Sequence, residues 1–303
     1  MLFPFYASIT NTFLACHLDS GTKSRKSYHW QHEISSSSLF LPPAPRVGYI
    51  HTNSSAIHKI DFVGQLMAWP NFEREVITTF SLPSTNWNND TLDVRVVGFG
   101  SQTSISEEQM VLGDEIGLQG RLGERLGRPV TSSLQAQQHR RRMGDFKASR
   151  PAAAGYRRIP DMVLFDGVPE IKVVGGAKAP WPDEHINMLS EGVDDFEAGQ
   201  EGPLRRRLGQ VARYMRELNV KHGFLSTYEE TIFLRKVDVR GVWTLQYSTV
   251  IAYDDPLTSQ TEGTTTQQGL YHVALLGQAD SVFTRRGGTR SPLRNHRWTI
   301  SRE

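Results

Sequence analysis

Two short apolar runs joined by turn residues constrain the fold of this chain more than any other feature. Met162 to Phe165 forms the first run, Ile171 to Val174 forms the second, and Asp166 to Pro169 (DGVP) lie between them. Apolar runs of this length bounded by Asp, Gly and Pro are typical of β-strands. This passage therefore predicts a β-hairpin.

A helical period follows Pro203. Apolar residues recur there at steps of four, three, four and three, at Leu204, Leu208, Val211, Met215 and Leu218. This spacing predicts an amphipathic helix that packs on the core. Its other faces carry Arg205, Arg206, Arg207, Arg213 and Arg216. Such arginines most often form a solvated face, although those at the start of the helix would suit phosphate contacts.

Weaker patterns predict the remaining elements. We expect a helix from about 104 to 127, a helix or two within 57–81, strands at 223–227, 231–237 and 242–251, and a last helix at 270–276. The buried side of the 104–127 helix should hold Met110, Ile116, Leu118, Leu122 and Leu126. The polar stretches 135–150 and 182–202 predict loops, and the arginines of the first stretch are expected to be solvated. This order of elements indicates an α/β (α+β) fold in which helices flank a mixed β-sheet.

The ends of the chain differ in composition from the middle. Residues 1–56 are rich in Ser and Pro, which predicts a poorly ordered segment. We expect 57–104 to be a helical or irregular extension that packs on the core and 105–280 to form the ordered domain. Residues 281–303 form a basic, arginine-rich tail. Leu2 to Cys16 is apolar without a preceding basic residue, so we expect an irregular start rather than a cleaved signal.

Charge and cysteine content exclude several classes of protein. The chain has 34 Lys and Arg against 32 Asp and Glu, so net charge selects neither nucleic acid nor a membrane as partner. Cys16 is the single cysteine, which excludes an internal disulfide and a multi-thiolate zinc site. It agrees with a reducing compartment, and we expect an intracellular protein, nuclear or cytoplasmic. No apolar run approaches the roughly 18 residues of a membrane span.

Four residues in the predicted domain carry candidate chemistry. Pro160-Asp161 opens the first hairpin strand, Lys178 comes late in the second, and Gln210 and Tyr214 lie one turn apart on the following helix. Their order resembles the PD-(D/E)XK, or restriction-endonuclease-like, nuclease superfamily. The wording VVGGAKAPW and LGQVARYM is similar to a group of fungal proteins built on that fold. The resemblance covers about 159–237.

The resemblance implies a restriction-endonuclease-like core and Mg²⁺-dependent hydrolysis of phosphodiester bonds. Asp161 and an acidic residue two positions before the lysine would hold the metal. Lys178 would orient the attacking water, and Gln210 and Tyr214 would face the site and the nucleic-acid backbone. Mg²⁺ suits such a site because it prefers oxygen ligands and keeps several waters.

Hairpin geometry decides which residue occupies the acidic position. The literal choice, Glu170-Ile171-Lys172, would pair Asp161 with Glu170 and place the bend near Phe165, before the turn residues. A bend centred near Val168 instead places Asp161 opposite Gly175 or Gly176, with Lys178 just beyond. The acidic position is therefore Gly176, which has no carboxylate. A metal would keep Asp161, the Ala177 carbonyl and an acid from the first helix, Glu115 or Glu124. Rescue by Glu170 or Asp166 through a bulge stays open.

Each of these residues also has a structural explanation. Pro-Asp is a common turn element, a strand lysine usually faces solvent, and Tyr214 would serve equally well to cap the core. Trp181 is expected to pack in the core rather than stack on a base. The arrangement nevertheless favours a nuclease-fold domain that binds DNA or RNA, with weak or lost hydrolysis and no small-molecule cofactor.

The alternative is a non-catalytic protein-interaction module on the same fold. Nucleic-acid affinity that falls with rising salt would separate the two hypotheses. A third hypothesis, a zinc-binding or glycosylated secreted protein, rests only on His29, His32 and the sequons at Asn53 and Asn89.

Overall fold

In the computed structural model, the described residues are 28–33, 46–47, 60–82, 91–96, 111–149, 156, 158–166, 170–182, 185–253, 263–279 and 299–301. Most of the segment 1–56 and of the tail 281–303, and with them the disorder and the basic tail predicted there, lie outside the described residues. Of these two parts, only the short strands β1 (Tyr28–Glu33), β2 (Arg46–Val47) and β14 (Thr299–Ser301) are described.

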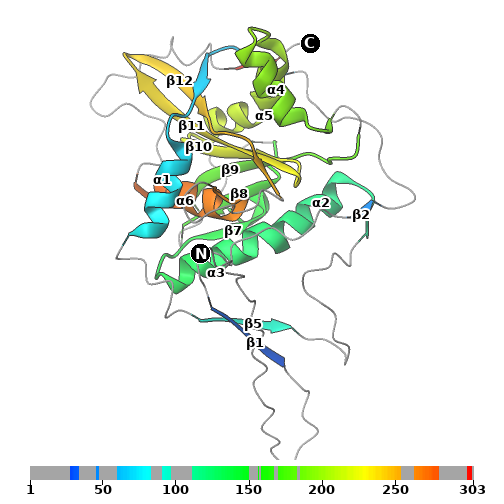
Figure 1. Ribbon diagram of the computed structural model, residues 1–303, viewed down its shortest axis with the longest axis vertical. Coiled ribbons are helices and arrows are strands. Elements are labelled where there is room, and N and C mark those ends of the chain that lie inside the picture. The colour runs from blue at the N-terminus through cyan, green and yellow to red at the C-terminus, as the bar shows by residue number, and fades with distance from the viewer. Residues whose placement is uncertain are drawn as a thin grey trace, which may run out of the picture.

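A mixed β-sheet of eight strands forms the centre of the molecule (Figure 1). Its order is β4 (Gln65–Ala68), β12 (Val242–Tyr247), β11 (Glu230–Val239), β10 (His222–Ser226), β9 (Ile171–Ala177), β8 (Met162–Phe165) and β7 (Arg142–Gly144). The short β13 (Ile251–Ala252) pairs with β11. The pairs β9–β10 and β4–β12 are parallel and the others antiparallel.

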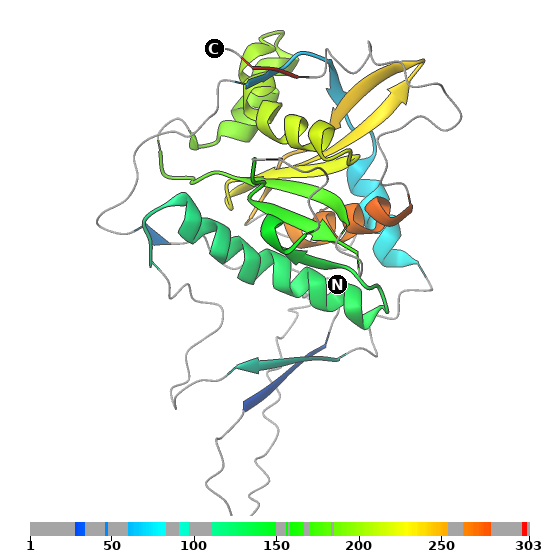
Figure 2. The same ribbon diagram turned by 180° about the vertical axis from the view of Figure 1, so that it is seen from behind.

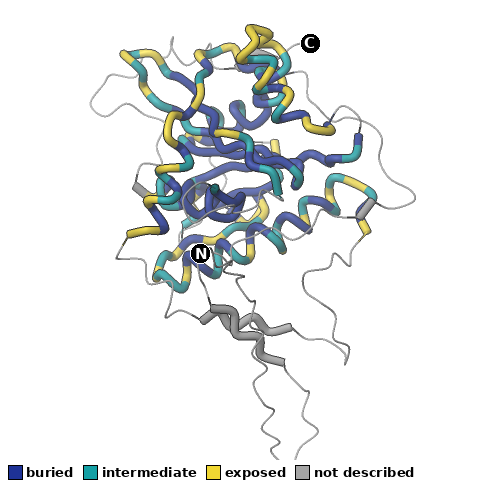
Figure 3. The backbone as a smooth tube through the Cα atoms, in the orientation of Figure 1, coloured by how far each residue is buried: buried dark blue, intermediate teal, exposed yellow. Residues whose placement is uncertain are grey.

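Helices cover both faces of this sheet (Figure 2). On one face lie α1 (Phe72–Ser81), α6 (Thr266–Ala279) and a long helical stretch made of α2 (Glu115–Leu122), a π-helical turn (Gly123–Gly127) and α3 (Arg128–Ala136). On the other lie α4 (Met188–Glu197) and α5 (Gly202–Glu217). Successive strand residues therefore enter different cores: Val173 and Phe224 face the first, and Val174 and Leu225 the second. The central strands are dark blue, and so buried, throughout Figure 3.

Three small two-stranded sheets lie apart from the main one. In them β1 pairs with β5 (Thr91–Val96), β2 with β6 (Val111–Leu112), and β3 (Ile60–Phe62) with β14. The β3 strand crosses α5 at Gly209, where an ideal Cβ would lie 1.9 Å from the carbonyl oxygen of Ile60. Only glycine permits so close an approach, and this contact fixes where the β3–β14 sheet sits.

The predicted hairpin is confirmed. Strand β8 spans the predicted residues and β9 continues three residues past the prediction, to Ala177. Met162 pairs with Gly175 and Leu164 with Val173, so the strand register is that of a bend centred near Val168. The turn itself, at 167–169, lies outside the described residues.

The following helix and strands are confirmed as well. All five apolar positions predicted to be buried on α5 are buried, as are the described ones at 118, 122 and 126 on the earlier helical stretch. The strands expected after α5 correspond to β10, β11 and β12 with β13, and α6 contains the last predicted helix. In the turn between β11 and β12, Arg240 and Gly241 both have positive φ, as a tight hairpin requires.

Three sequence predictions are wrong. The stretch 182–202 contains α4, which begins after Asn187 because the Glu230 carboxylate of β11 accepts hydrogen bonds from the N–H groups of Leu189 and Ser190, at 2.9 and 3.2 Å. That partner is 40 residues distant in sequence from Ser190, so local patterns do not reveal it. Within 57–81 the expected helix is present as α1 and packs on the core, and the strands β3 and β4 before it were not predicted.

The other two errors concern the long helical stretch and the segment after it. The described helix begins at Glu115, is capped by Asp114, and runs through the π-helical turn to Ala136. Ile116, which was expected to be buried, is 74% exposed, and Met110 lies outside the described residues. The expected loop at 135–150 contains β7, and Arg141 is fully buried, donating to the Ala274 carbonyl at 2.8 Å. In the part of the chain that is described, no helix is long and apolar enough to cross a membrane.

Candidate functional site

The hairpin brings Asp161 and the end of β9 together. Asp161 immediately precedes β8, and the pairing of Met162 with Gly175 places it beside Gly176, as predicted. The backbone N–H of Ala177 donates to Asp161 Oδ2 at 2.8 Å. An ideal Cβ at Gly176 would lie 4.0 Å from the same oxygen. The carboxylate is thus fixed beside the end of β9, next to Gly176.

Helix α2 contributes two further side chains. Glu115 Oε1 lies 3.1 Å from Lys178 Nζ, and Gln119 Nε2 donates to Asp161 Oδ1 at 2.8 Å. The two residues are four apart and therefore share a face of the helix. Sequence reasoning named Glu115 as a candidate and missed Gln119. The spacing from Glu115 is the signal that would have found it.

Helix α5 brings the predicted glutamine and tyrosine to the same place. Gln210 Nε2 donates to Tyr214 Oη at 2.8 Å, and that hydroxyl lies 3.4 Å from the carbonyl oxygen of Ile159, two residues before Asp161. Burial raises the pKa of Tyr214, the hydrogen bond from Gln210 lowers it, and the charge of Asp161 raises it further. The structure thus gathers Asp161, Lys178, Glu115, Gln210 and Tyr214 around the open end of the hairpin.

Burial dominates the electrostatics of Asp161. It raises the pKa of that carboxyl to about 6, although the Ala177 N–H and the charge of Lys178 both act to lower it, and Glu115 adds a further raising effect. Lys178 is itself buried, and its backbone N–H donates to the Ser226 carbonyl at the end of β10. A carboxyl that titrates near neutrality beside a buried ammonium is typical of functional sites.

The arrangement does not fit Mg²⁺. Both oxygens of Asp161 accept hydrogen bonds from N–H groups, and the ammonium of Lys178 already neutralises Glu115. Position 176 supplies no carboxylate, and the contact shown for Ala177 is its N–H on Asp161. Among the described residues, no group of three or more His, Cys, Asp or Glu side chains is arranged to hold a metal ion. A divalent cation would have to displace an ammonium and at least one donor.

The other candidate acids lie elsewhere. Glu170 pairs with Lys172 at 2.9 Å, and its carbonyl accepts from the N–H of Asp166. It therefore lies opposite Asp166, about 17 Å of strand from Asp161. Glu124 pairs with Arg121 and is half exposed. Neither joins the cluster around Asp161 in this structure.

The arginines of α5 have partners within the chain. Arg205 donates to the carbonyl oxygens of Phe62 and Gly64, at 3.2 and 2.7 Å, and Arg206 lies 3.5 Å from Asp61. Arg207 donates to the Met188 carbonyl. These residues hold β3 and α4 against α5. Neither interpretation of the sequence, a solvated face or contacts with phosphates, included this role. Trp181 packs against the core, as predicted.

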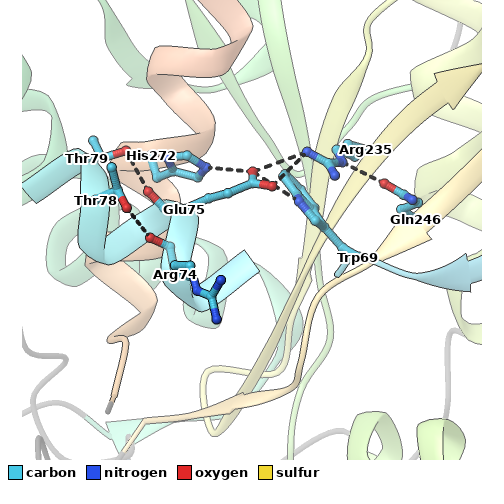
Figure 4. Close-up of polar contacts among 8 residues, drawn as sticks. All are labelled: Trp69, Arg74, Glu75, Thr78, Thr79, Arg235, Gln246 and His272. Carbon is cyan, nitrogen blue, oxygen red and sulfur yellow. Dashed lines mark hydrogen bonds and ion pairs between the residues drawn. The ribbon is translucent and has the colours of Figure 1, made fainter. Parts of the chain in front are cut away.

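A second polar cluster ties α1 to the sheet and to α6 (Figure 4). The carboxylate of Glu75 accepts hydrogen bonds from Trp69 Nε1 and Arg235 Nη1, both at 3.2 Å, and lies 3.7 Å from His272 Nε2. The guanidinium of Arg235 stacks over Trp69 at 3.9 Å. His272 Nδ1 lies 2.7 Å from Thr79 Oγ1, and burial lowers the pKa of the histidine to about 4. Sequence reasoning did not single out this network, because its members come from three distant parts of the chain.

The comparisons with known proteins assign no family. No family model, no curated protein and no solved structure matches the chain.

Proposed function

We propose that the chain is a nuclease-fold domain of the PD-(D/E)XK type that binds nucleic acid, with hydrolysis weak or lost. The observation that carries this proposal is the position of Asp161 beside Gly176 and Lys178 on adjacent strands. Glu115 from the preceding helix and Tyr214 from the following one complete the arrangement. The long helix, three antiparallel strands, α5 and the parallel strand β10 occur in the order that brings these residues together.

Loss of hydrolysis is expected from the same contacts. The residues that would bind a metal are bonded to one another, so the chain's own residues support no reaction step through a metal. The ammonium of Lys178 acts on Asp161 through its charge, but its side chain is only 5% exposed and is paired with Glu115, and Tyr214 is buried as well. These contacts form a polar cluster without an activated nucleophile.

The basic surface for nucleic acid is proposed on the α2–α3 side, because the arginines of α5 are used internally. Residues 111–149 contain seven Lys and Arg against four Asp and Glu, an excess of three positive charges. Arg128, Arg140 and Arg142 are exposed there. Arg128 begins α3, Arg140 follows the end of that helix and Arg142 begins β7, so these exposed arginines are available to contact the phosphates of a strand.

The test is binding of labelled single- and double-stranded DNA and RNA, followed by fluorescence anisotropy at several salt concentrations with EDTA present. We expect affinity to fall steeply as salt rises. Arg128→Gln and Arg142→Gln should each reduce the magnitude of the salt slope by about 1. Arg240→Gln, which removes an exposed arginine in the β11–β12 turn, is the matched control and should change little. Binding that is absent or independent of salt would refute the proposal.

A second function, a non-catalytic protein-interaction module, is favoured by one observation. Ile116 and Ile159 are 74% and 51% exposed; the first follows Glu115 and the second lies two residues before Asp161. Exposed apolar side chains beside a polar cluster are common where proteins bind one another. If no nucleic acid binds, this becomes the leading proposal. An intracellular location remains a proposal that rests on the single cysteine.

A further inference from the structure

The glycine at 176 is held there by packing. An ideal Cβ at this position would lie 2.8 Å from Val211 Cγ2 and 3.1 Å from Leu225 Cδ1. Both neighbours are completely or almost completely buried, and valine has little freedom to move because its side chain is β-branched. A glutamate at 176 would therefore push α5 away from β9 before its carboxylate reached Asp161. Position 176 is an unfavourable place from which to supply a third carboxylate.

Position 119 has the geometry that position 176 lacks. The side chain of Gln119 already reaches Asp161 Oδ1 at 2.8 Å, and it is only half-buried. Glu115 lies one turn earlier on the same face and contacts Lys178. Glutamine and glutamate have the same shape, so a carboxylate at 119 would fit where the amide now lies. The amide N–H thus occupies the place at Asp161 where a cation would otherwise bind.

We propose that Gln119 is a positioning residue that closes the Asp161 carboxylate against divalent cations, and that exchange of this one residue for glutamate opens the site to them. This role deepens the proposed function and rests on it, because it names the contact that keeps the nuclease-like site free of metal. It concerns cation binding alone and requires no nucleic acid. In Gln119→Glu, carboxylates at 115, 119 and 161 would lie together, and a divalent cation would relieve their repulsion.

The experiment is isothermal titration of the full chain with Mn²⁺ in the absence of nucleic acid. Wild type should show at most weak binding, and Gln119→Glu should bind Mn²⁺ at least about tenfold more tightly. The matched control is Gln135→Glu, which adds the same charge at an exposed position on α3 and should behave like wild type. Addition of Asp161→Asn to Gln119→Glu should abolish the gain.

Two results would overturn the proposal. One is wild type that binds Mn²⁺ as tightly as Gln119→Glu; the other is a folded Gln119→Glu that binds no more tightly than Gln135→Glu. Folding is checked by circular dichroism. If Gln119→Glu does not fold, the same titration is made with Gln119→Ala, which removes the donor and leaves room for water. Tighter Mn²⁺ binding than wild type then supports the proposal, and equal binding refutes it.

Cation binding is measured independently of the proposed function. The anisotropy assay contains EDTA and reports nucleic-acid affinity alone, whereas the titration reports cation affinity alone. A protein that binds no nucleic acid but gains Mn²⁺ affinity through Gln119→Glu would refute the proposed function and leave the role of Gln119 standing.

Discussion

Lys178 Nζ lies 3.1 Å from Glu115 Oε1, and the lysine side chain is only 5% exposed. The pair joins the end of β9 to the first turn of α2. Glu115 is 27% exposed and retains some contact with water, whereas the Lys178 side chain is almost completely buried beside it. Breaking one side of such a pair leaves a buried ammonium, whereas removing both sides is often tolerated.

Glu115→Gln should therefore destabilise the protein by about 2 to 3 kcal/mol, and the double variant Glu115→Gln with Lys178→Met should recover most of that loss. Urea denaturation of the three proteins measures both values. If the single substitution costs no more than about 0.5 kcal/mol, the pair behaves like an exposed one and Lys178 is solvated.

Asp161 should make the protein less stable as pH rises through the acid range. Its folded pKa of about 6 lies above the ordinary value of 3.8, so the folded state holds a proton that the unfolded state has lost. The contribution is present below about pH 4 and is lost by about pH 7, at a cost of roughly 3 kcal/mol. Asp161→Asn should therefore stabilise the protein at pH 7 and leave it unchanged at pH 4, since Gln119 can rotate its amide to accept from the asparagine. Equal effects at the two pH values would contradict the raised pKa.

His272 should make the protein less stable as pH falls, which is the opposite of the effect of Asp161. Its folded pKa of about 4 lies below the ordinary value of 6.5, because burial disfavours the imidazolium and Arg235 adds to this, while Glu75 opposes it. The folded state binds fewer protons, so this contribution is complete above pH 6.5 and is lost as pH falls towards 4, by roughly 3 kcal/mol. His272→Gln should flatten the stability profile between those values. NMR titration of the imidazole checks the cause directly, and a pKa near 6.5 would refute it.

Gly209→Ala should detach β3 from α5. The added Cβ would meet the carbonyl oxygen and carbon of Ile60 at 1.9 and 2.7 Å, and these backbone atoms have no alternative rotamer. We expect a loss of about 3 kcal/mol, in the upper range for overpacked cores. Gly120→Ala, on α2 with no atom within 4 Å of its ideal Cβ, is the matched control and should stabilise by about 0.5 to 1 kcal/mol. Similar effects of the two substitutions would show that β3 does not rest on α5.

The elements predicted correctly are those whose pattern is local. The β8–β9 hairpin carries its turn residues and its two apolar runs close together in sequence, and α5 repeats its apolar positions along its whole length. The same locality allowed the register of Asp161 against Gly176 to be predicted by counting from the turn. Asp161, Lys178, Gln210 and Tyr214 were named from sequence because their order resembles that of a nuclease motif.

The elements that were missed depend on distant partners. Helix α4 begins where Glu230 satisfies its first N–H groups, and Arg141 is buried because the Ala274 carbonyl, 133 residues later, accepts its hydrogen bond. Gln119 was missed for a related reason, because its partner Asp161 lies 42 residues further along the chain and only its spacing of four from Glu115 indicated a shared helix face.

The sequence by itself therefore determined the hairpin, its register and the absence of a carboxylate at 176, because side-chain alternation and turn chemistry act over a few residues. Only the tertiary structure decided which charges meet. It placed Glu115 on Lys178 and Gln119 on Asp161, bonded Arg205 of α5 to the Phe62 carbonyl of β3, and set Val211 against Gly176. These outcomes depend on how helices pack across a sheet, and the free energy of packing belongs to surfaces brought together from distant parts of the chain.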